Sequence, residues 1–238
     1  MASAQAPATR HFYQLRRYLL QSGPQTQLTE NYFAHALIPA LNRLEINPVG
    51  AFRLDFGSET PVYYLLMPST SLETLCTIDL LLAKDDAFLK AAEPFWNAPA
   101  AQPAFNRVES SLLAAFTGWP KITPPELKKR IFQLRTYESP SYRDHVSKVA
   151  MFHDGEFEIF AKCGFKQVFY GDALIGSRLP SLTYMLSFPD TTELAAAWER
   201  FRTDPDWQKL SHSSKYAFEP IVSNISNLIL APLACSQV

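Results

Sequence analysis

The sequence predicts an α+β protein in which two β-α-β-β-α-β halves close on each other as a pseudo-twofold αβ barrel. An internal repeat and the order of elements within each copy predict this fold. FYQLRRY at residues 12–18 recurs as IFQLRTY at residues 131–137, an offset of 133 − 14 = 119 between the two glutamines. The same offset aligns Phe33 with Phe152 and Lys90 with Lys209. One register kept over most of a half predicts two copies of one structural unit.

Each copy begins with an alternating strand and continues into an amphipathic helix. Apolar residues three and four apart predict these helices at about Gln27–Leu44 and about Tyr142–Cys163. Pro39 should kink or split the first of them. A strand pair follows in each half, and short polar links suit hairpin turns between its members. The predicted pairs are about Val49–Phe56 with Val62–Met67, and Gln167–Leu174 with Leu182–Phe188.

A second helix and a last strand complete each half. The second helices begin at Ser71 and Thr191, whose side chains suit capping. The last strands are predicted at about Val108–Phe116 and Ile221–Leu230. Three prolines in residues 119–129 indicate a linker. The predicted organisation is a disordered segment (1–10), a first half (11–118), the linker (119–129) and a second half (130–238).

The predicted units explain why the halves should close on each other. A β-α-β-β-α-β unit places both helices on one face of its sheet and leaves the other face bare. Roughly ten uncovered side chains at ~1.5–3 kcal/mol each amount to ~10 kcal/mol or more, which is comparable with the whole stability of a domain. A second half in the same chain covers that face.

Three stretches resemble the NIPSNAP family. They are the repeated QLRxY, LTYMLSFPD at Leu182–Asp190, and AAWERFRTDPDWQKL at Ala196–Leu210. In the first half DDAF at Asp85–Phe88 stands where the second has DPDW. The resemblance implies ferredoxin-like halves of the dimeric αβ-barrel superfamily, which includes small monooxygenases, isomerases and ligand-binding proteins that often form oligomers. The resemblance therefore implies that the chain could form a homo-oligomer. Similarity of fold alone assigns no function.

Composition and motifs argue against several classes of function. A formal net charge of −1 gives no electrostatic basis for binding nucleic acid. No apolar run reaches the ~18–20 residues of a membrane span. Cys76, Cys163 and Cys235 have no paired spacing, and the histidines lie at no zinc-site spacing. We therefore predict no metal and no cofactor, and we assign no catalytic residue.

The N-terminus has two interpretations. Residues 2–9, ASAQAPAT, are small residues of the kind found around a signal-peptidase cleavage site. The chain is then an exported protein without its leader. The alternative is an ordinary disordered start, which leaves a cytoplasmic location open.

The candidate ligand site comes from the first strand of each half. Strand side chains alternate, so Gln14, Arg16 and Tyr18 share one face, with Tyr13 and Leu15 on the other. We expect the apolar face to pack on helices and the polar face to point into the barrel. Two converging polar sets could bind an anionic or carbonyl-bearing ligand. The candidate residues are Gln14, Arg16, Tyr18, Gln133, Arg135, Tyr137, and the nearly equivalent Tyr64 and Tyr184.

The sequence leaves the function open between three interpretations. The first is a non-catalytic ligand-binding or interaction barrel. The second is a cofactor-independent monooxygenase or isomerase that acts on an aromatic or hydroxylated small molecule, and the third is a structural building block. Arg16 and Arg135 discriminate between them. If both are paired with carboxylates and the space between the two sheets is filled with rings, the polar sets hold the structure together, whereas an open cavity between the sheets, lined by both arginines unpaired, favours a ligand.

Overall fold

The computed structural model describes residues 9–238 and contains one closed antiparallel barrel of eight strands. Both predictions for the N-terminal segment, disorder and export, depend on residues 1–8, which lie outside the described residues. The strands are β1 (Phe12–Leu19), β2 (Gly50–Phe56), β3 (Val62–Ser69), β4 (Arg107–Ala115), β5 (Ile131–Glu138), β6 (Lys166–Ile175), β7 (Ser181–Phe188) and β8 (Asn224–Pro232).

The strand order confirms the predicted α+β barrel. Around the barrel it is β1-β3-β2-β8-β5-β7-β6-β4, with β4 pairing back onto β1. Each half therefore supplies four adjacent strands in the same relative order, β4-β1-β3-β2 and β8-β5-β7-β6. Two seams, β2–β8 and β4–β6, join the halves. Because the sheet closes on itself, it has no free edge strand.

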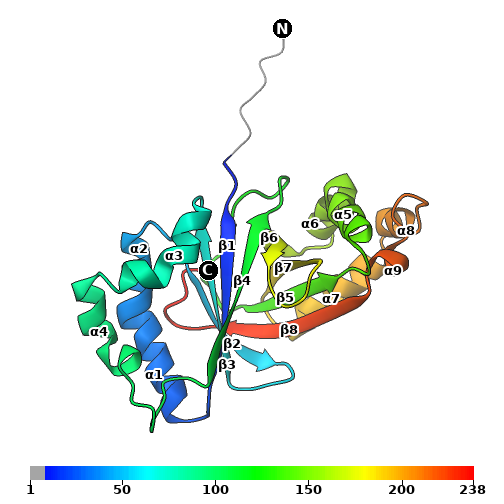
Figure 1. Ribbon diagram of the computed structural model, residues 1–238. Helices are drawn as coiled ribbons and strands as arrows, with labels where there is room; N and C mark the ends of the chain where they lie inside the picture. Colours follow the sequence, from blue (N-terminus) through cyan, green and yellow to red (C-terminus); the bar gives the residue numbers. More distant parts are fainter. Residues whose placement is uncertain (1–8) are drawn as a thin grey trace.

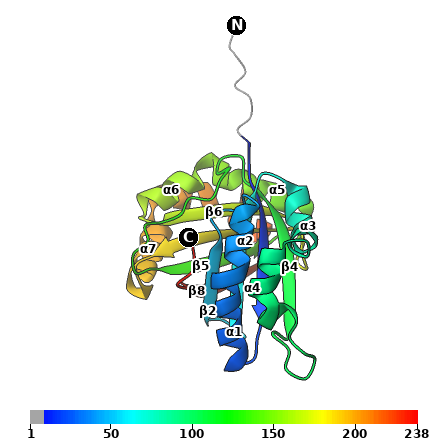
Figure 2. The ribbon, with the colours of Figure 1, turned by 90° about the vertical axis from the view of Figure 1, so that its left-hand side faces the viewer.

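The helices cover the outside of the barrel in two separate groups. Figure 1 shows α1–α4 on one side of the strands and α5–α9 on the other. Turned by 90°, α1, α2 and α4 stand together over the strands of the first half (Figure 2). The first group is α1 (Pro24–Tyr32), α2 (Ile38–Arg43), α3 (Leu72–Leu82) and α4 (Asp86–Trp96); the second is α5 (Tyr142–Met151), α6 (Phe157–Lys162), α7 (Thr191–Thr203), α8 (Pro205–Ser211) and α9 (Phe218–Ile221).

A π turn interrupts the long helix of each half at the same aligned position. These turns are η1 (Phe33–Leu37) and η2 (Phe152–Glu156). The interruption predicted from Pro39 takes this form: η1 widens the turn ahead of proline, which has no N–H to donate. In η2 the chain leaves the helical conformation, because Gly155 has φ 137°, a region that favours glycine.

The second helices differ from the prediction in detail. Ser71 caps α3 as expected, but the cap of α7 is Asp190, whose carboxylate accepts a hydrogen bond from Glu193 N. Each second helix is followed by a separate one, α4 or α8. Ile221 ends the short α9 and does not begin the last strand, which starts at Asn224.

The barrel interior is filled with apolar side chains. Tyr13 packs on Phe169 with ring centroids 5.1 Å apart, and Phe52 packs on Phe132 at 4.9 Å. Two further cores lie between the sheet and the helices of each half. Within residues 9–238, no helix is both long and apolar enough to cross a lipid bilayer.

Candidate ligand-binding cleft

An open cleft of about 820 Å³ lies in the second half, between strands β5 and β8 and helices α7, α8 and α9. Its size is typical of small-molecule sites. Aromatic rings form one wall: Phe201 and Trp207 have ring centroids 4.3 Å apart, and Phe218 packs on Trp207 at 5.5 Å. The polar residues at its floor come from the strands, and they are Gln133, Arg135, Tyr137 and Asn227.

The predicted direction of the polar sets was wrong. Gln14, Arg16 and Tyr18, like Gln133, Arg135 and Tyr137, point outward to the helices, as their contacts with α3 and α7 show. Tyr13 and Leu15 belong to the interior of the barrel instead. The reason is that closure makes the interior the most enclosed layer, so the more apolar face of the strand is buried there. The cleft is therefore outside the barrel.

Arg135 has only neutral partners. Its Nη2 donates a hydrogen bond to Tyr137 Oη at 3.1 Å, and its guanidinium lies 4.4 Å from the ring centroid of Trp198. Its buried Nε has no hydrogen-bond partner among residues 9–238. Cation–π contacts orient a guanidinium but leave its N–H groups available. The cleft thus contains a largely buried cation without a bonded carboxylate in the described chain.

A chain of amides runs beside Arg135 with fixed directions. Trp198 Nε1 donates to Gln133 Oε1 at 2.7 Å, and Gln133 Nε2 donates to Asn227 Oδ1 at 2.8 Å. An indole nitrogen can only donate, so it fixes which end of each amide is the acceptor. The amide N–H groups of Asn227 then remain available. Asn227 is opposite Arg135 in the β5–β8 register.

The equivalent arginine of the first half, Arg16, is held by an ion pair, and we call this half the closed half. Arg16 Nη1 and Nη2 donate to the two oxygens of Asp79 at 2.9 and 3.0 Å, and Nε donates to Gln14 Oε1 at 3.1 Å. All three donor nitrogens are engaged. The repeat offset explains the difference, since 198 − 119 = 79 puts Asp79 where the second half has Trp198. The two arginines therefore differ in pairing, and the space between the sheets, where the sequence predicted the cavity, is filled with apolar side chains.

Tyr64 and Tyr184 do not share a site. Tyr184 lies opposite Arg135 on β7 and faces the helices, where its hydroxyl is 2.8 Å from that of Tyr137. Tyr64 belongs to the barrel interior. The true counterpart of Tyr184 is Leu65, at 184 − 119, opposite Arg16. A one-residue displacement in a strand moves a side chain to the other face.

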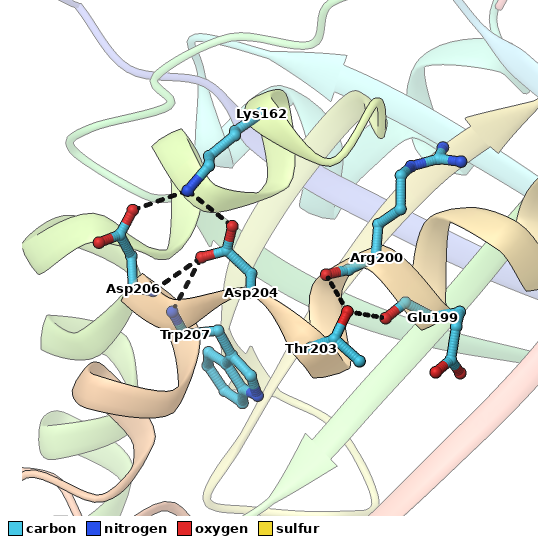
Figure 3. A network of polar contacts seen from close by, with 7 residues as sticks. All are labelled: Lys162, Glu199, Arg200, Thr203, Asp204, Asp206 and Trp207. Carbon is cyan, nitrogen blue, oxygen red and sulfur yellow. Dashed lines mark hydrogen bonds and ion pairs between the residues drawn. The ribbon is translucent and has the colours of Figure 1, made fainter.

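The Asp-Pro-Asp-Trp turn between α7 and α8 fixes the position of Trp207 (Figure 3). Asp204 caps α8, accepting hydrogen bonds from Asp206 N at 2.9 Å and Trp207 N at 3.2 Å. Lys162 Nζ contacts both carboxylates, Asp204 at 2.7 Å and Asp206 at 2.8 Å. Hydrogen bonds from Lys162 and from the backbone hold the pKa of Asp204 below its usual value. This turn anchors the ring wall of the cleft.

A buried ion pair, Lys148 with Glu156, lies behind the ring wall. Both side chains are almost fully buried, at 0% and 1% exposure. Burial raises the pKa of Glu156, and Lys148 opposes that effect. Lys148 Nζ is 4.8 Å from the Phe218 ring centroid and 5.4 Å from that of Tyr137. The offset places Thr29 and Leu37 at these positions in the first half.

Clustered metal-ligating side chains and reactive thiols are two further features to consider in the described part of the chain. No group of three or more His, Cys, Asp or Glu side chains lies together there. The three cysteines are free: Cys76 is exposed, Cys163 buried and Cys235 half-buried. Burial raises the pKa of the Cys163 thiol, which disfavours the reactive thiolate.

Sequence reasoning missed several residues of the cleft. Trp198 was not among the candidate residues, although its indole donates a hydrogen bond to Gln133 and its ring lies against Arg135. Asn227 and Phe218 were not singled out. The repeat alignment could have indicated Trp198, because the aligned residue in the first half is the charged Asp79. The Gln, Arg and Tyr of the first strand are identical in the two copies. Asn227 and Phe218 depend on the β5–β8 pairing and on the turn before α9, which no local pattern indicated.

The fold and the cleft define a class: an αβ barrel of two ferredoxin-like halves with an aromatic-walled cavity on one of them. The model of the NIPSNAP family matches residues 132–237, the half that contains the cleft. Residues 132–237 of the chain are therefore similar to the NIPSNAP family. No protein with a curated description matches the chain.

Several solved structures share the whole fold. A proposed monooxygenase from Lactobacillus acidophilus has a TM-score of 0.61 at 11% identity, over 94% of each chain. A proposed monooxygenase from Fusobacterium nucleatum has a TM-score of 0.62 at 9% identity, over 94% of this chain and 93% of that one. An anthrone oxidase-like protein has a TM-score of 0.52 at 11% identity, over 94% of this chain and 91% of that one. At such identities the likeness concerns the fold alone.

Proposed function

We propose that the cleft of the second half binds a small organic molecule that carries an anionic or carbonyl group. The single observation that carries this proposal is the environment of Arg135, a largely buried cation whose bonded partners are neutral. A buried charge is costly unless it is paired. A ligand oxygen in the cleft would supply the pairing that Asp79 supplies to Arg16.

The ring wall indicates the rest of the ligand. Trp207, Phe201 and Phe218 offer apolar faces on one side of the cleft, and the polar floor lies along β5 and β8. Burying a flat apolar body against these rings contributes roughly 25 cal/mol per Å² of apolar surface removed from water. The proposed ligand-binding residues are Gln133, Arg135, Tyr137 and Asn227, with Tyr184 behind Tyr137.

Titration calorimetry with 2-naphthoate tests the proposal. The wild-type protein should bind the acid, and Arg135→Met should weaken binding about tenfold or more, because hydrogen bonds to charged groups contribute ~1.5–3 kcal/mol. Arg16→Met is the matched control, since it removes the same residue from the same strand position in the closed half. Equal binding by wild type and Arg135→Met, or no binding of any aromatic acid tested, would overturn the proposal.

Catalysis by a cofactor-independent enzyme is the second candidate. The observation that favours it is the pair of hydroxyls of Tyr137 and Tyr184, 2.8 Å apart and next to Arg135. Such donors could stabilise negative charge that develops on a substrate oxygen. Turnover of an aromatic hydroxyl compound by wild type and its loss in Tyr137→Phe would support this candidate over simple binding.

A further inference from the structure

The hydrogen bonds around Tyr184 determine which way its proton points. Tyr184 is fully buried, and its phenol oxygen lies 2.8 Å from Tyr137 Oη. Arg135, the other polar group beside it, can only donate. A buried hydroxyl without an acceptor costs about 1–3 kcal/mol. Tyr184 therefore donates its proton to Tyr137.

This direction determines what Tyr137 offers to a ligand. Its oxygen already accepts from Tyr184 and from Arg135 Nη2, so it has no lone pair left for a third donor. Its own proton has no other acceptor within the described chain, and Tyr137 lines the cleft. Its O–H is consequently directed to the cleft. Three kinds of donor meet there: the phenol of Tyr137, the guanidinium of Arg135 and the amide of Asn227.

Each side-chain amide oxygen on the same floor already accepts one hydrogen bond from the protein. Gln133 Oε1 is taken by Trp198 and Asn227 Oδ1 by Gln133. A neutral hydroxyl group needs an acceptor for its proton, whereas the side-chain groups of this floor that have no protein partner, the Tyr137 O–H, Arg135 Nε and the Asn227 amide nitrogen, are all donors. An oxyanion needs only donors and is also attracted by the charge of Arg135. The cleft should therefore bind the oxyanion of a ligand more tightly than the neutral hydroxyl form of the same ligand.

We propose that the cleft binds phenols and enols as their oxyanions and so promotes their ionisation. The O–H bond of the ligand breaks, its proton leaves to solvent through the open side of the cleft, and the electron pair remains on the oxygen. That oxygen accepts hydrogen bonds from Tyr137 and Arg135. This inference rests on the proposed function, because the ligand class is a subset of the anionic or carbonyl compounds assigned to the same cleft.

The other titratable groups that face the cleft come from α7, from the turn after α8 and from α9. Arg202 on α7 is paired with Glu199. His212 follows α8, and Glu219 lies on α9. Behind the wall, Lys148 and Glu156 compensate each other. Glu219 opposes an anionic ligand, and the imidazole of His212 is another group that could contact one, so both need control variants.

Spectrophotometric titration of 4-nitrophenol tests the inference, since its phenolate is yellow and its phenol is not. Bound to the wild type, its pKa should be lowered by about one to two units, as an opposite charge at short range produces. Arg135→Met should lose most of this shift, and Tyr137→Phe should reduce it and still bind, because the phenol supplies a hydrogen bond but no charge. Tyr18→Phe, its counterpart in the first half, should leave the shift unchanged. His212→Gln and Glu219→Gln should keep the preference for the phenolate.

The outcomes distinguish the preference for an oxyanion from the proposed binding of an anionic or carbonyl compound. If 4-nitrophenol and 2-naphthoate both fail to bind at any pH, both are wrong. If 2-naphthoate binds but 4-nitrophenol keeps its pKa in solution, or binds no better than the non-ionisable 4-nitroanisole, only the inference is wrong. A shift that persists in Arg135→Met and disappears in His212→Gln would also overturn it. Circular dichroism of each variant establishes that it is folded.

Discussion

The two halves of the molecule place the same arginine on the same strand and use it differently. In the first half Arg16 forms a bidentate ion pair with Asp79, so its guanidinium is not available to a ligand. In the second half Arg135 stacks on Trp198 beside an open cleft. Gln, Arg and Tyr are identical in both strands, so they do not decide the outcome. One facing position, residue 79 on α3 and residue 198 on α7, decides whether the arginine is structural or available to a ligand.

The helices after that position differ as well. In the first half α4 is continuous from Asp86 to Trp96, and Tyr32 stacks on Phe95 with centroids 3.9 Å apart. In the second half α8 ends at Ser211 and the chain returns as the short α9. The interrupted helix leaves room that the continuous one fills. The cleft thus depends on both the unpaired arginine and the broken helix.

The largest expected effect comes from the buried ion pair that distinguishes the second half. Lys148→Met should lower the free energy of unfolding by about 3–5 kcal/mol, because it leaves the Glu156 carboxylate buried without a partner. Urea denaturation measures the loss. The double variant Lys148→Met/Glu156→Leu, which gives the second half the leucine of the first, should recover most of it. A single variant as stable as wild type would show that the pair does not matter for folding.

Converting the open half to the closed pattern should abolish ligand binding. Trp198→Asp gives Arg135 the carboxylate that Arg16 has, and should weaken 2-naphthoate binding by about tenfold or more. Calorimetry provides the measurement. Trp198→Leu is the control, since it removes the ring without adding a charge. If the aspartate and leucine variants bind equally, competition for the arginine is not what separates the halves.

The capping turn should have a smaller effect, and one that depends on pH. Asp204→Ala should cost about 1–2 kcal/mol at pH 7, because Trp207 N and Asp206 N lose their acceptor. The pKa of Asp204 is lowered in the folded protein. Its contribution is therefore complete above the unfolded value of about 3.9 and is lost as pH falls through the folded one. Stability curves of wild type and variant should converge at low pH, and parallel curves would contradict this.

The smallest effect is expected from opening the closed half. Asp79→Asn should destabilise the protein by about 0.5–1 kcal/mol, since the aspartate is 60% exposed and solvent screens the pair. Thermal unfolding measures it. This variant should not create a second binding site, because the continuous α4 still fills the space. Two molecules of 2-naphthoate bound per chain would show that the ion pair alone closes the first half.

The sequence predicted the barrel well and the site only in part. The repeat offset and the alternating apolar pattern were sufficient for the order of elements along each half and for closure of the barrel, because closure buries the bare face of each sheet. The direction of the polar set was predicted wrongly, since alternation shows that Arg135 and Leu134 face opposite sides but not which side is interior. Tyr64 was paired with Tyr184 on an offset one residue too long, and in a strand that error exchanges the faces.

The remaining parts of the site depend on contacts between distant segments. Asn227 reaches Gln133 across 94 residues of sequence, through the β5–β8 pairing. Phe218 reaches the cleft through a turn with Ala217 at φ 42°. Local patterns do not encode such contacts. The comparison of aligned positions could have indicated Trp198 against Asp79, because a change from a carboxylate to an indole beside an unchanged arginine alters its pairing.

The seams β2–β8 and β4–β6 join the two halves within a single chain. In a barrel assembled from two identical subunits, any substitution appears on both sides at once, so a carboxylate that secures one arginine would block the other. Here position 79 can change while position 198 does not. The first half can therefore be selected for stability and the second for ligand binding. Each half can acquire substitutions that would be harmful at the equivalent position of the other.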